Sequence, residues 1–202
     1  MATPITGGKL QTKVADMNVG DYIAARYTTT SATGAGSYSE IGTVDTTKVA
    51  ELNVQADTPV LDGYVYLIKI DKGVLVPNKK LFAKAGIAAA TFYAAMNADN
   101  LIYGKKVTID TKDYLMRVPN MNECIAMTST LNGAVLVADR YTNFCNGTDG
   151  DRYEFIQENY NPTPGYADFA TTPAGFSYTT GAMNARLVLV YNDDAKCTDL
   201  FH

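Results

Sequence analysis

A β-hairpin is the clearest element in this sequence. Residues 64–70, Tyr-Val-Tyr-Leu-Ile-Lys-Ile, are a run of aromatic, β-branched and aliphatic residues, a composition that favours a strand. Asp71-Lys72-Gly73 follows, and its glycine suits a tight turn before the second apolar run at Val74–Val76. The pattern predicts a hairpin around which a sheet has to be organised.

Shorter alternating runs extend this β-rich character over the residues before the hairpin. Thr and Tyr fit a pleated surface, whereas Gly and Asn are suited to turns. The predicted elements are strands over residues 9–14, 21–30 and 37–44, a turn at 18–21 and a flexible surface loop at 31–36.

The hydrophobic period changes after the hairpin. From Asn78 to Met96, apolar residues recur at intervals of three and four, which predicts a helix of about five turns with Asn78 as its cap. A second, brief helix is expected over residues 121–127. Asn120 would cap it, and Glu123 falls in its first turn, where the helix dipole favours a carboxylate.

The rest of the C-terminal half combines strands with loops. Apolar runs predict strands over residues 105–110, 114–118 and 134–138, and a nearly continuous apolar run predicts a central strand over 185–191. Residues 141–183 are rich in Tyr, Asn, Gly, Pro and Thr, a composition that predicts a long, loop-rich excursion.

Length and charge bound the fold and the partners. A chain of 202 residues, 47% of them hydrophobic, supports one domain or two small ones. We expect an α+β fold, with a β-rich part over 1–76 and a mixed part over 77–202 that holds one longer helix, one short helix and long loops. Seventeen basic against 21 acidic residues give a net charge of −4, which disfavours nucleic acid and anionic membranes as partners.

The start of the chain, Met-Ala-Thr-Pro-Ile-Thr-Gly-Gly, lacks the basic head and apolar run of a secretory signal. No apolar stretch approaches the roughly 18 residues of a membrane span. We therefore expect a protein that is made in the cytoplasm without a signal peptide and that has no contact with a membrane.

Residue types used for catalysis are scarce. The one histidine is the last residue, His202, and Cys124, Cys145 and Cys197 form no Cys-x-x-Cys pair. Residues 175–179, Gly-Phe-Ser-Tyr-Thr, lack the final glycine of a nucleophile elbow, and a phosphate-binding loop is absent. We expect no catalytic residue, no enzyme activity and no cofactor.

Carboxylates in the loop-rich part leave a glycan hydrolase open, because such an enzyme needs only two well-spaced carboxyl groups. Solvated loop charge is the interpretation we favour. The four carboxylates are Asp139, Asp151, Glu154 and Glu158.

An oxygen-rich turn in the same region offers weak candidates for a calcium site, since it lacks the spacing of an EF-hand loop. An ordinary Asx-turn without a metal is the favoured interpretation. The candidate ligands are Asn146, Asp149 and Asp151.

Aromatic residues embedded in Asn, Gly, Thr and Pro mark residues 141–183 as a candidate recognition surface. This mix supplies rigid amphipathic contacts beside adaptable hydrogen-bonding groups. The same residues could instead fold back into a small satellite core. The candidate ligand-binding residues are Tyr153, Tyr160, Tyr166, Phe169 and Tyr178.

Four stretches of the chain resemble virion-surface proteins of tailed phages, chiefly of Gram-positive hosts. In such proteins the second half looks like a C-type-lectin-type fold, in which a short helix follows an Asn-Glu-Trp-like motif and a final apolar strand supports variable loops. Cys124 stands here at the place of the Trp. The stretches are residues 9–28, residues 66–76, Arg117-Val-Pro-Asn-Met-Asn-Glu-Cys124 and Arg186-Leu-Val-Leu-Val-Tyr-Asn192.

The resemblance implies a non-enzymatic protein of the virion surface. Residues 1–76 would dock on other virion proteins, and the loop-rich surface of 141–183 would contact a host cell-wall glycan or polymer as a receptor-binding or adhesin-type appendage. A homo-oligomer is expected, because repeated copies give a small module avidity. The alternative is a structural decoration or connector of the capsid, neck or tail with no host ligand.

Overall fold

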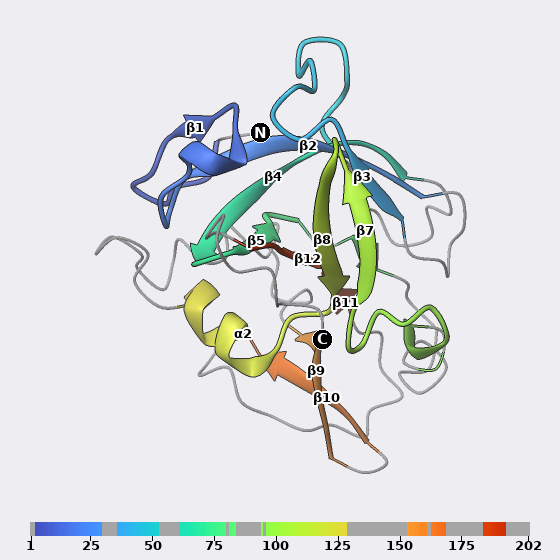
Figure 1. The fold of residues 1–202 in the computed structure, drawn as a ribbon. Coiled ribbons are helices and arrows are strands. Elements are labelled where there is room, and N and C mark those ends of the chain that lie inside the picture. Colours follow the sequence, from blue (N-terminus) through green and yellow to red (C-terminus); the bar gives the residue numbers. More distant parts are fainter. Residues whose placement is uncertain are drawn as a thin grey trace.

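Strands predominate in the computed structural model, and helices are few among the residues that it describes (Figure 1). The expected α+β class is thereby confirmed in its general form. The described residues are 3–29, 36–52, 61–79, 81–83, 94, 96–128, 153–160, 163–168 and 184–192.

An eight-stranded mixed sheet forms most of the described structure. Its spatial order is β1-β2-β4-β5-β12-β8-β7, with β3 also paired to β2. β1 runs parallel to β2, and the other neighbours are antiparallel. The strands are β1 (Leu10–Gln11), β2 (Tyr22–Thr29), β3 (Ser37–Ser39), β4 (Leu61–Asp71), β5 (Val74–Pro77), β7 (Lys105–Ile109), β8 (Lys112–Arg117) and β12 (Val188–Val190).

The C-terminal apolar run supplies the central strand of this sheet, as predicted. β12 pairs with β5 on one side and with β8 on the other, so the sheet crosses the boundary at residue 76. The predicted hairpin is confirmed as β4–β5, and Gly73 has the positive φ of 70° that its turn requires.

The β7–β8 turn brings two distant parts of the sheet together. Asp110 and Thr111 separate the paired residues Ile109 and Lys112, and both turn residues have positive φ, the geometry of a type I′ turn. The Asp110 carboxylate also accepts a hydrogen bond of 2.8 Å from the backbone N–H of Ile41, just after β3. The sheet therefore curls until β3 lies beside the β7–β8 hairpin (Figure 1).

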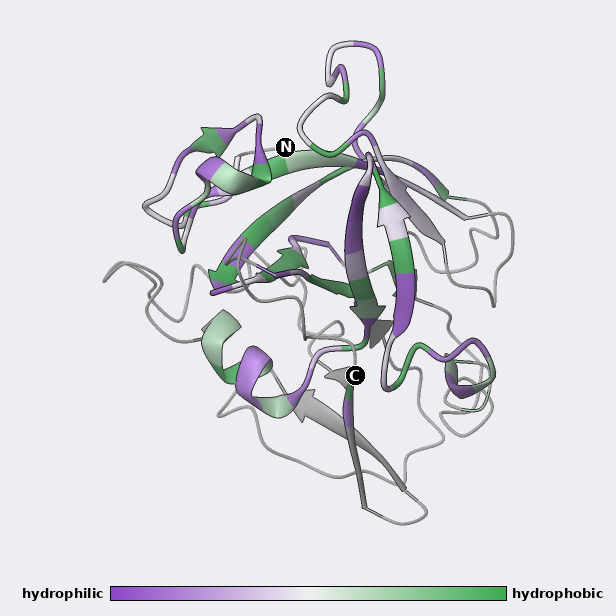
Figure 2. Cartoon of the chain, in the orientation of Figure 1, coloured by the Kyte–Doolittle hydropathy of each residue, from purple (hydrophilic) through white to green (hydrophobic). Residues whose placement is uncertain are grey.

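The large sheet is buried on both faces over residues 22–25 of β2 and 65–70 of β4. Alternate residues of β2 belong to two cores: Ile23 and Ala25 to one, Tyr22 and Ala24 to the other. Strands with two covered faces need nearly continuous apolar runs. Figure 2 shows hydrophobic residues along β4 and β5, whereas β7 and β8 carry hydrophilic residues as well as hydrophobic ones.

A buried aspartate organises the N-terminal segment. The predicted strand over 9–14 is limited to the two residues of β1, and a 3₁₀ turn, η1 (Val14–Asp16), follows. The Asp21 carboxylate, 4% exposed, accepts hydrogen bonds from the backbone N–H groups of Lys9 and Asn18 and from the Gln11 amide. Burial acts to raise the pKa of Asp21, but these hydrogen bonds outweigh it and hold the pKa below its usual value.

A second, four-stranded sheet has the order β10-β9-β11-β6. The predicted loop-rich excursion over 141–183 is wrong for its middle part, which forms the β9–β10 hairpin. A run of β-prone aromatic residues around Ile156 explains this outcome. The strands are β6 (Phe82–Ala83), β9 (Tyr153–Tyr160), β10 (Thr163–Asp168) and β11 (Asn184–Ala185).

The predicted strand over 185–191 is divided between the two sheets. β11 belongs to the small sheet and β12 to the large one, and Arg186 and Leu187 between them are fully buried. The Arg186 guanidinium donates to the backbone carbonyl of Pro77. This crossing couples the two sheets within one short stretch of chain.

The long helix predicted from Asn78 is wrong at its start. The Asn78 amide oxygen accepts a hydrogen bond from the Tyr66 N–H of β4, and residues 82 and 83, which were expected in the first turns of the helix, form β6. Phe82 and Ala83 pair with β11 instead, since tertiary pairing overrides a local helical period. Residues 84–93 lie outside the described residues, and 96–98 are helical.

The other expectations are met in part. The strand expected over 37–44 ends at Ser39, because Glu40 and Gly42 take positive φ in a turn. The short helix is confirmed as α2 (Met121–Thr128). The expected loop at 31–35 and the strand over 134–138 lie outside the described residues.

Candidate recognition site

Three of the predicted ligand-binding residues lie in the β9–β10 hairpin. Tyr153 and Tyr160 are the first and last residues of β9, and Tyr166 belongs to β10. The strand register sets Tyr166 opposite Phe155 and Tyr153 opposite Asp168. Residues that are spread over the predicted loop are thereby brought into one short element.

Among the described strands, β10 lies at one edge of the small sheet, and this edge is poorly suited to pairing with another strand. β10 is the edge strand of the small sheet and carries Pro164, opposite Asn159. Proline has no N–H to donate, and the register shifts between Pro164 and Tyr166. Both features are of the kind that protects an edge against strand addition.

The hairpin is fixed at the middle of β9 to the segment before α2. The backbone N–H of Gln157 donates to the Pro119 carbonyl at 2.8 Å. Ile156, which is fully buried, packs in the same core cluster as Cys124 and Met127 of α2. The stability of the hairpin therefore depends on how firmly α2 is held (Figure 1).

A buried ion pair holds α2 to β8. The Arg117 guanidinium donates to both carboxylate oxygens of Glu123 at 2.6 and 2.7 Å, and it also donates to the Val118 carbonyl at 2.9 Å. The two side chains are 10% and 8% exposed. A bidentate pair with additional hydrogen bonds is the arrangement in which a buried ion pair is best compensated for its loss of solvation.

The same glutamate completes the cap of α2. The Asn120 side chain accepts a hydrogen bond of 2.8 Å from the Glu123 N–H, and the Glu123 carboxylate accepts one of 2.8 Å from the Asn120 N–H. This reciprocal arrangement satisfies two backbone donors at the helix start. The predicted cap is confirmed. Glu123 of α2 is thus bonded both to Arg117 at the end of β8 and to the cap residue Asn120.

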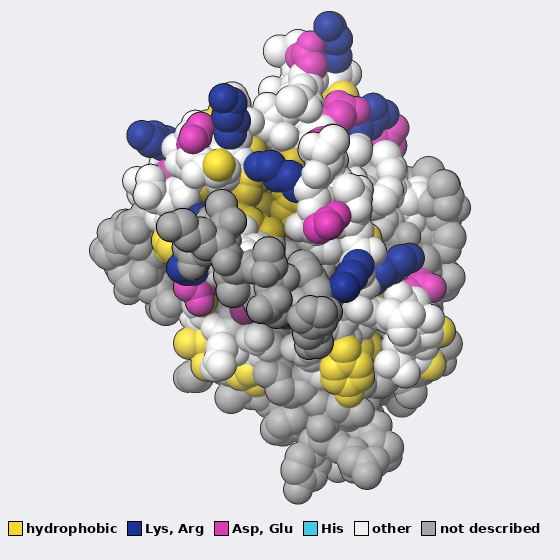
Figure 3. Space-filling view, in the orientation of Figure 1, with side chains coloured by type: hydrophobic (Ala, Val, Ile, Leu, Met, Phe, Trp, Pro, Cys, Tyr) yellow, Lys and Arg dark blue, Asp and Glu magenta, His cyan; other side chains and the backbone are white. Residues whose placement is uncertain are grey.

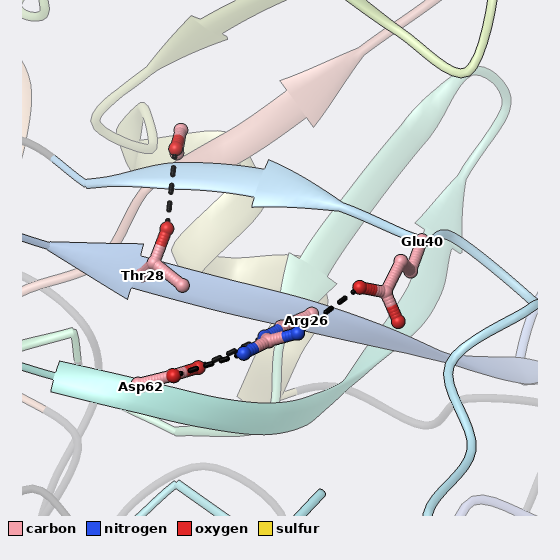
Figure 4. Close-up of polar contacts among 5 residues, drawn as sticks. Arg26, Thr28, Glu40 and Asp62 are labelled. Atoms are coloured by element: carbon pink, nitrogen blue, oxygen red, sulfur yellow. Dashed lines mark hydrogen bonds and ion pairs between the residues drawn. The ribbon is translucent and has the colours of Figure 1, made fainter.

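A second arginine, Arg26 on β2, forms a similar pair on the surface. Its Nε and Nη2 donate to the two oxygens of Asp62, both at 2.9 Å, and its Nη1 donates to Glu40 at 3.2 Å (Figure 4). The side chains of Arg26, Glu40 and Asp62 are 33%, 42% and 52% exposed. The hydrogen bond from Arg26 lowers the pKa of Asp62, and both carboxylates raise the pKa of Arg26.

Sequence reasoning missed both arginines. Arg117 stands in a strand in which Tyr114 and Met116 are also buried. The charged Arg117 beside apolar residues of one strand could have indicated a buried ion pair, because a buried arginine requires a partner. For Arg26 the strand alternation was visible, but the sequence does not say that Asp62, 36 residues away, lies next to it.

Several candidate residues lie outside the described residues. Among the residues that are described, no group of three His, Cys, Asp or Glu side chains could hold a metal ion, and no helix is long and apolar enough to cross a membrane. Glu154 and Glu158 lie in β9. The residues outside are Asp139, Cys145, Asn146, Asp149, Asp151, Phe169, Tyr178, Cys197 and His202.

The charges on the visible face are mixed. Figure 3 shows Lys and Arg side chains interspersed with Asp and Glu over the described part of the face, and neither sign forms a broad patch there. A surface of this kind gives no strong field for steering a highly charged polymer.

Comparison of the chain with protein-family models, with curated proteins and with solved structures finds no match.

Proposed function

We propose that this protein is a non-enzymatic component of a tailed-phage virion surface and that the β9–β10 hairpin contacts the host cell surface as part of a receptor-binding or adhesin-type appendage. The observation that carries the proposal is the hairpin itself. It holds Tyr153, Tyr160 and Tyr166 in two paired strands. β9 is bonded to the segment before α2, and a buried ion pair joins α2 to β8. Aromatic residues on a rigid base lose little conformational entropy on binding.

The location of the four stretches that resemble virion-surface proteins supports the proposal. They correspond to β1–β2, to the β4–β5 hairpin, to the junction of β8 with α2, and to β12. These elements belong to the large sheet and to the segment to which β9 is bonded. The resemblance thus lies in the supporting elements, and the tyrosine-rich residues 141–183 lie between the last two of these stretches.

A C-type-lectin-like arrangement of the second half is the finer form of this proposal. The supporting features are the short α2 helix after β8, the central strand β12 and the intervening hairpin. The fully buried Cys124 occupies the place of the Trp in the family motif. A smaller apolar side chain in a filled core position is compatible with the same role in packing.

Residues 1–76 would dock the protein on the virion. Ile5 and Leu10 are 50% and 53% exposed, although both are large and apolar. Leu10 belongs to β1, at one end of the large sheet. The exposed apolar side chains of Ile5 and Leu10 also favour the second candidate function. In that case the protein is a decoration or connector that contacts only other virion proteins, such as further copies of itself.

Adsorption of particles separates the two candidates. Particles that carry Tyr153→Ala, Tyr160→Ala and Tyr166→Ala together should keep the protein and lose adsorption to host cells. The matched control is Tyr103→Ala, which removes a tyrosine 65% exposed and outside the hairpin, and which should leave adsorption unchanged. Particles that lack the triple variant altogether would support the structural role instead.

A further inference from the structure

The outer face of β2, β3 and β4 carries two rows of residues across three neighbouring strands. The strand register sets Ser37, Thr28 and Asp62 side by side in one row, and Ser39, Arg26 and Tyr64 in the next. We refer to these six residues, together with Glu40, as the Arg26 surface. In contrast to the neighbouring Tyr66 and Ala24, which are buried, its members are exposed or half-buried.

The positions of the polar groups on the Arg26 surface are fixed. Asp62 holds the guanidinium of Arg26 in a bidentate pair, and Glu40 holds its third nitrogen (Figure 4). The hydroxyls of Thr28 and Ser37 lie 3.4 Å apart on the neighbouring row. A planar guanidinium held on two sides loses little side-chain freedom when it binds a ligand.

An aromatic ring lies beside these polar groups. Tyr64 is the direct cross-strand partner of Arg26, a position at which side chains on one face are about 5 Å apart. The Tyr64 ring packs edge-to-face on Tyr66 with centroids 5.6 Å apart, and Tyr66 packs in the same way on Tyr22 at 5.3 Å. The half-buried ring at the end of this row is therefore held in place by its neighbours.

The Arg26 surface has both hydrogen-bond donors and hydrogen-bond acceptors available. Three of the five N–H groups of a guanidinium are used by the two carboxylates. Two N–H donors therefore remain at Arg26, beside carboxylate oxygens and hydroxyls that can accept. One positive and two negative charges leave the group with a single net negative charge, which disfavours an anionic ligand.

We infer that the Arg26 surface is a binding site for an uncharged saccharide, separate from the β9–β10 hairpin. Each sugar hydroxyl both donates and accepts, which matches the fixed mixture of donors and acceptors around Arg26. The apolar face of a sugar ring suits the flank of Tyr64. The site is an open sheet face, so it fits a segment of an extended polymer, bound weakly by each copy and more strongly by several.

The experiment is an NMR titration of the isotope-labelled full chain with maltohexaose and with chitohexaose, and with an oligogalacturonate as the anionic comparison. We expect an uncharged oligosaccharide to shift the backbone amides of Arg26, Thr28 and Tyr64. The amides of β9 and β10 should move less. Absence of any shift with both uncharged sugars, or stronger binding of the oligogalacturonate, would overturn the inference.

Variants separate a binding role from a structural one. Arg26→Met should weaken binding about tenfold, the effect of losing hydrogen bonds from a charged group. Ser37→Ala removes an exposed hydroxyl, leaves the ion pairs in place, and should also weaken binding while the amide spectrum stays that of the folded protein. The matched control is Thr108→Ala on β7, whose exposed hydroxyl donates to Asp113. Equal affinity for all the variants would place the sugar elsewhere.

This inference does not depend on the proposed function. Loss of host adsorption in the hairpin variant, with sugar binding at Arg26 intact, would show two independent surfaces. Failure of the hairpin variant to affect adsorption would leave the saccharide titration as a separate test.

Discussion

Two arginine–carboxylate pairs of nearly the same geometry stand in different surroundings in this protein. Arg117 and Glu123 form a bidentate pair whose side chains are 10% and 8% exposed. Arg26 and Asp62 form one whose side chains are 33% and 52% exposed. The first pair also binds backbone groups on both sides of a strand–helix junction, whereas the second faces solvent.

The difference shows how burial changes what an ion pair does. Removing one partner of a buried pair leaves an uncompensated charge, which costs about 3–5 kcal/mol. An exposed pair contributes about 0–1 kcal/mol, because water and salt screen it. Arg117 and Glu123 thus serve the fold, whereas Arg26 keeps two N–H donors that the carboxylates of Asp62 and Glu40 do not use.

Removal of the buried carboxylate should have the largest effect. Glu123→Ala leaves Arg117 unpaired and the cap incomplete, so we expect the free energy of unfolding in urea to fall by about 3–5 kcal/mol. The backbone amide of Gln157, which bonds the middle of β9 to Pro119, should exchange its hydrogen faster. The control is Glu40→Ala on the exposed cluster, and an equal loss in both variants would contradict the distinction.

Removal of the cap alone should have an intermediate effect. Asn120→Ala takes away the side chain that accepts from the Glu123 N–H but leaves the ion pair with Arg117. We expect a loss of about 1 kcal/mol in the urea experiment, as for other helix caps. A loss as large as that of Glu123→Ala would mean that the cap, and not the ion pair, holds the junction.

Removal of the exposed carboxylate should have a small effect. Asp62→Ala should change the free energy of unfolding by about 1 kcal/mol or less. Because exposed charges are screened, the difference from the natural protein should shrink further when the urea experiment is repeated in about 1 M salt. A difference that does not change with salt would mean that Asp62 acts by positioning the aliphatic part of the Arg26 side chain for packing, and not through its charge.

The smallest expected effect is the change with pH in the contribution of Asp62 to stability. Arg26 lowers the pKa of Asp62 in the folded protein, so the folded state binds a proton at Asp62 less readily than the unfolded state. The contribution of the ionised Asp62 to the free energy of unfolding is therefore fully present above the unfolded pKa of about 3.9. It is lost as the pH falls through the lower pKa of the folded state. The stability difference between the natural protein and Asp62→Asn should be constant from neutral pH to about 5 and decline below about 4.

Local signals sufficed for the parts of the fold that depend on neighbours in the sequence. The β4–β5 hairpin follows from an apolar run and the turn at Gly73, and the cap of α2 follows from Asn120 and Glu123 three residues later. The central position of β12 follows from its continuous apolar run.

Long-range pairing explains what the sequence did not reveal. The period that predicted a helix from Asn78 is overridden at Phe82 by pairing with β11, about 100 residues later. The contacts of Arg26 with Asp62 and of Gln157 with Pro119 likewise join distant segments. At the candidate site, composition singled out Tyr153, but only the register shows that it shares a hairpin with Tyr166.

The most direct test of the central claim is the binding of the purified natural protein to isolated cell walls of Gram-positive bacteria, with sedimentation alongside to count its subunits. The account predicts saturable binding that falls in the triple tyrosine variant of the hairpin and persists in Tyr103→Ala. A well-folded oligomer that binds no wall would contradict it and would leave the protein as a structural component of the virion.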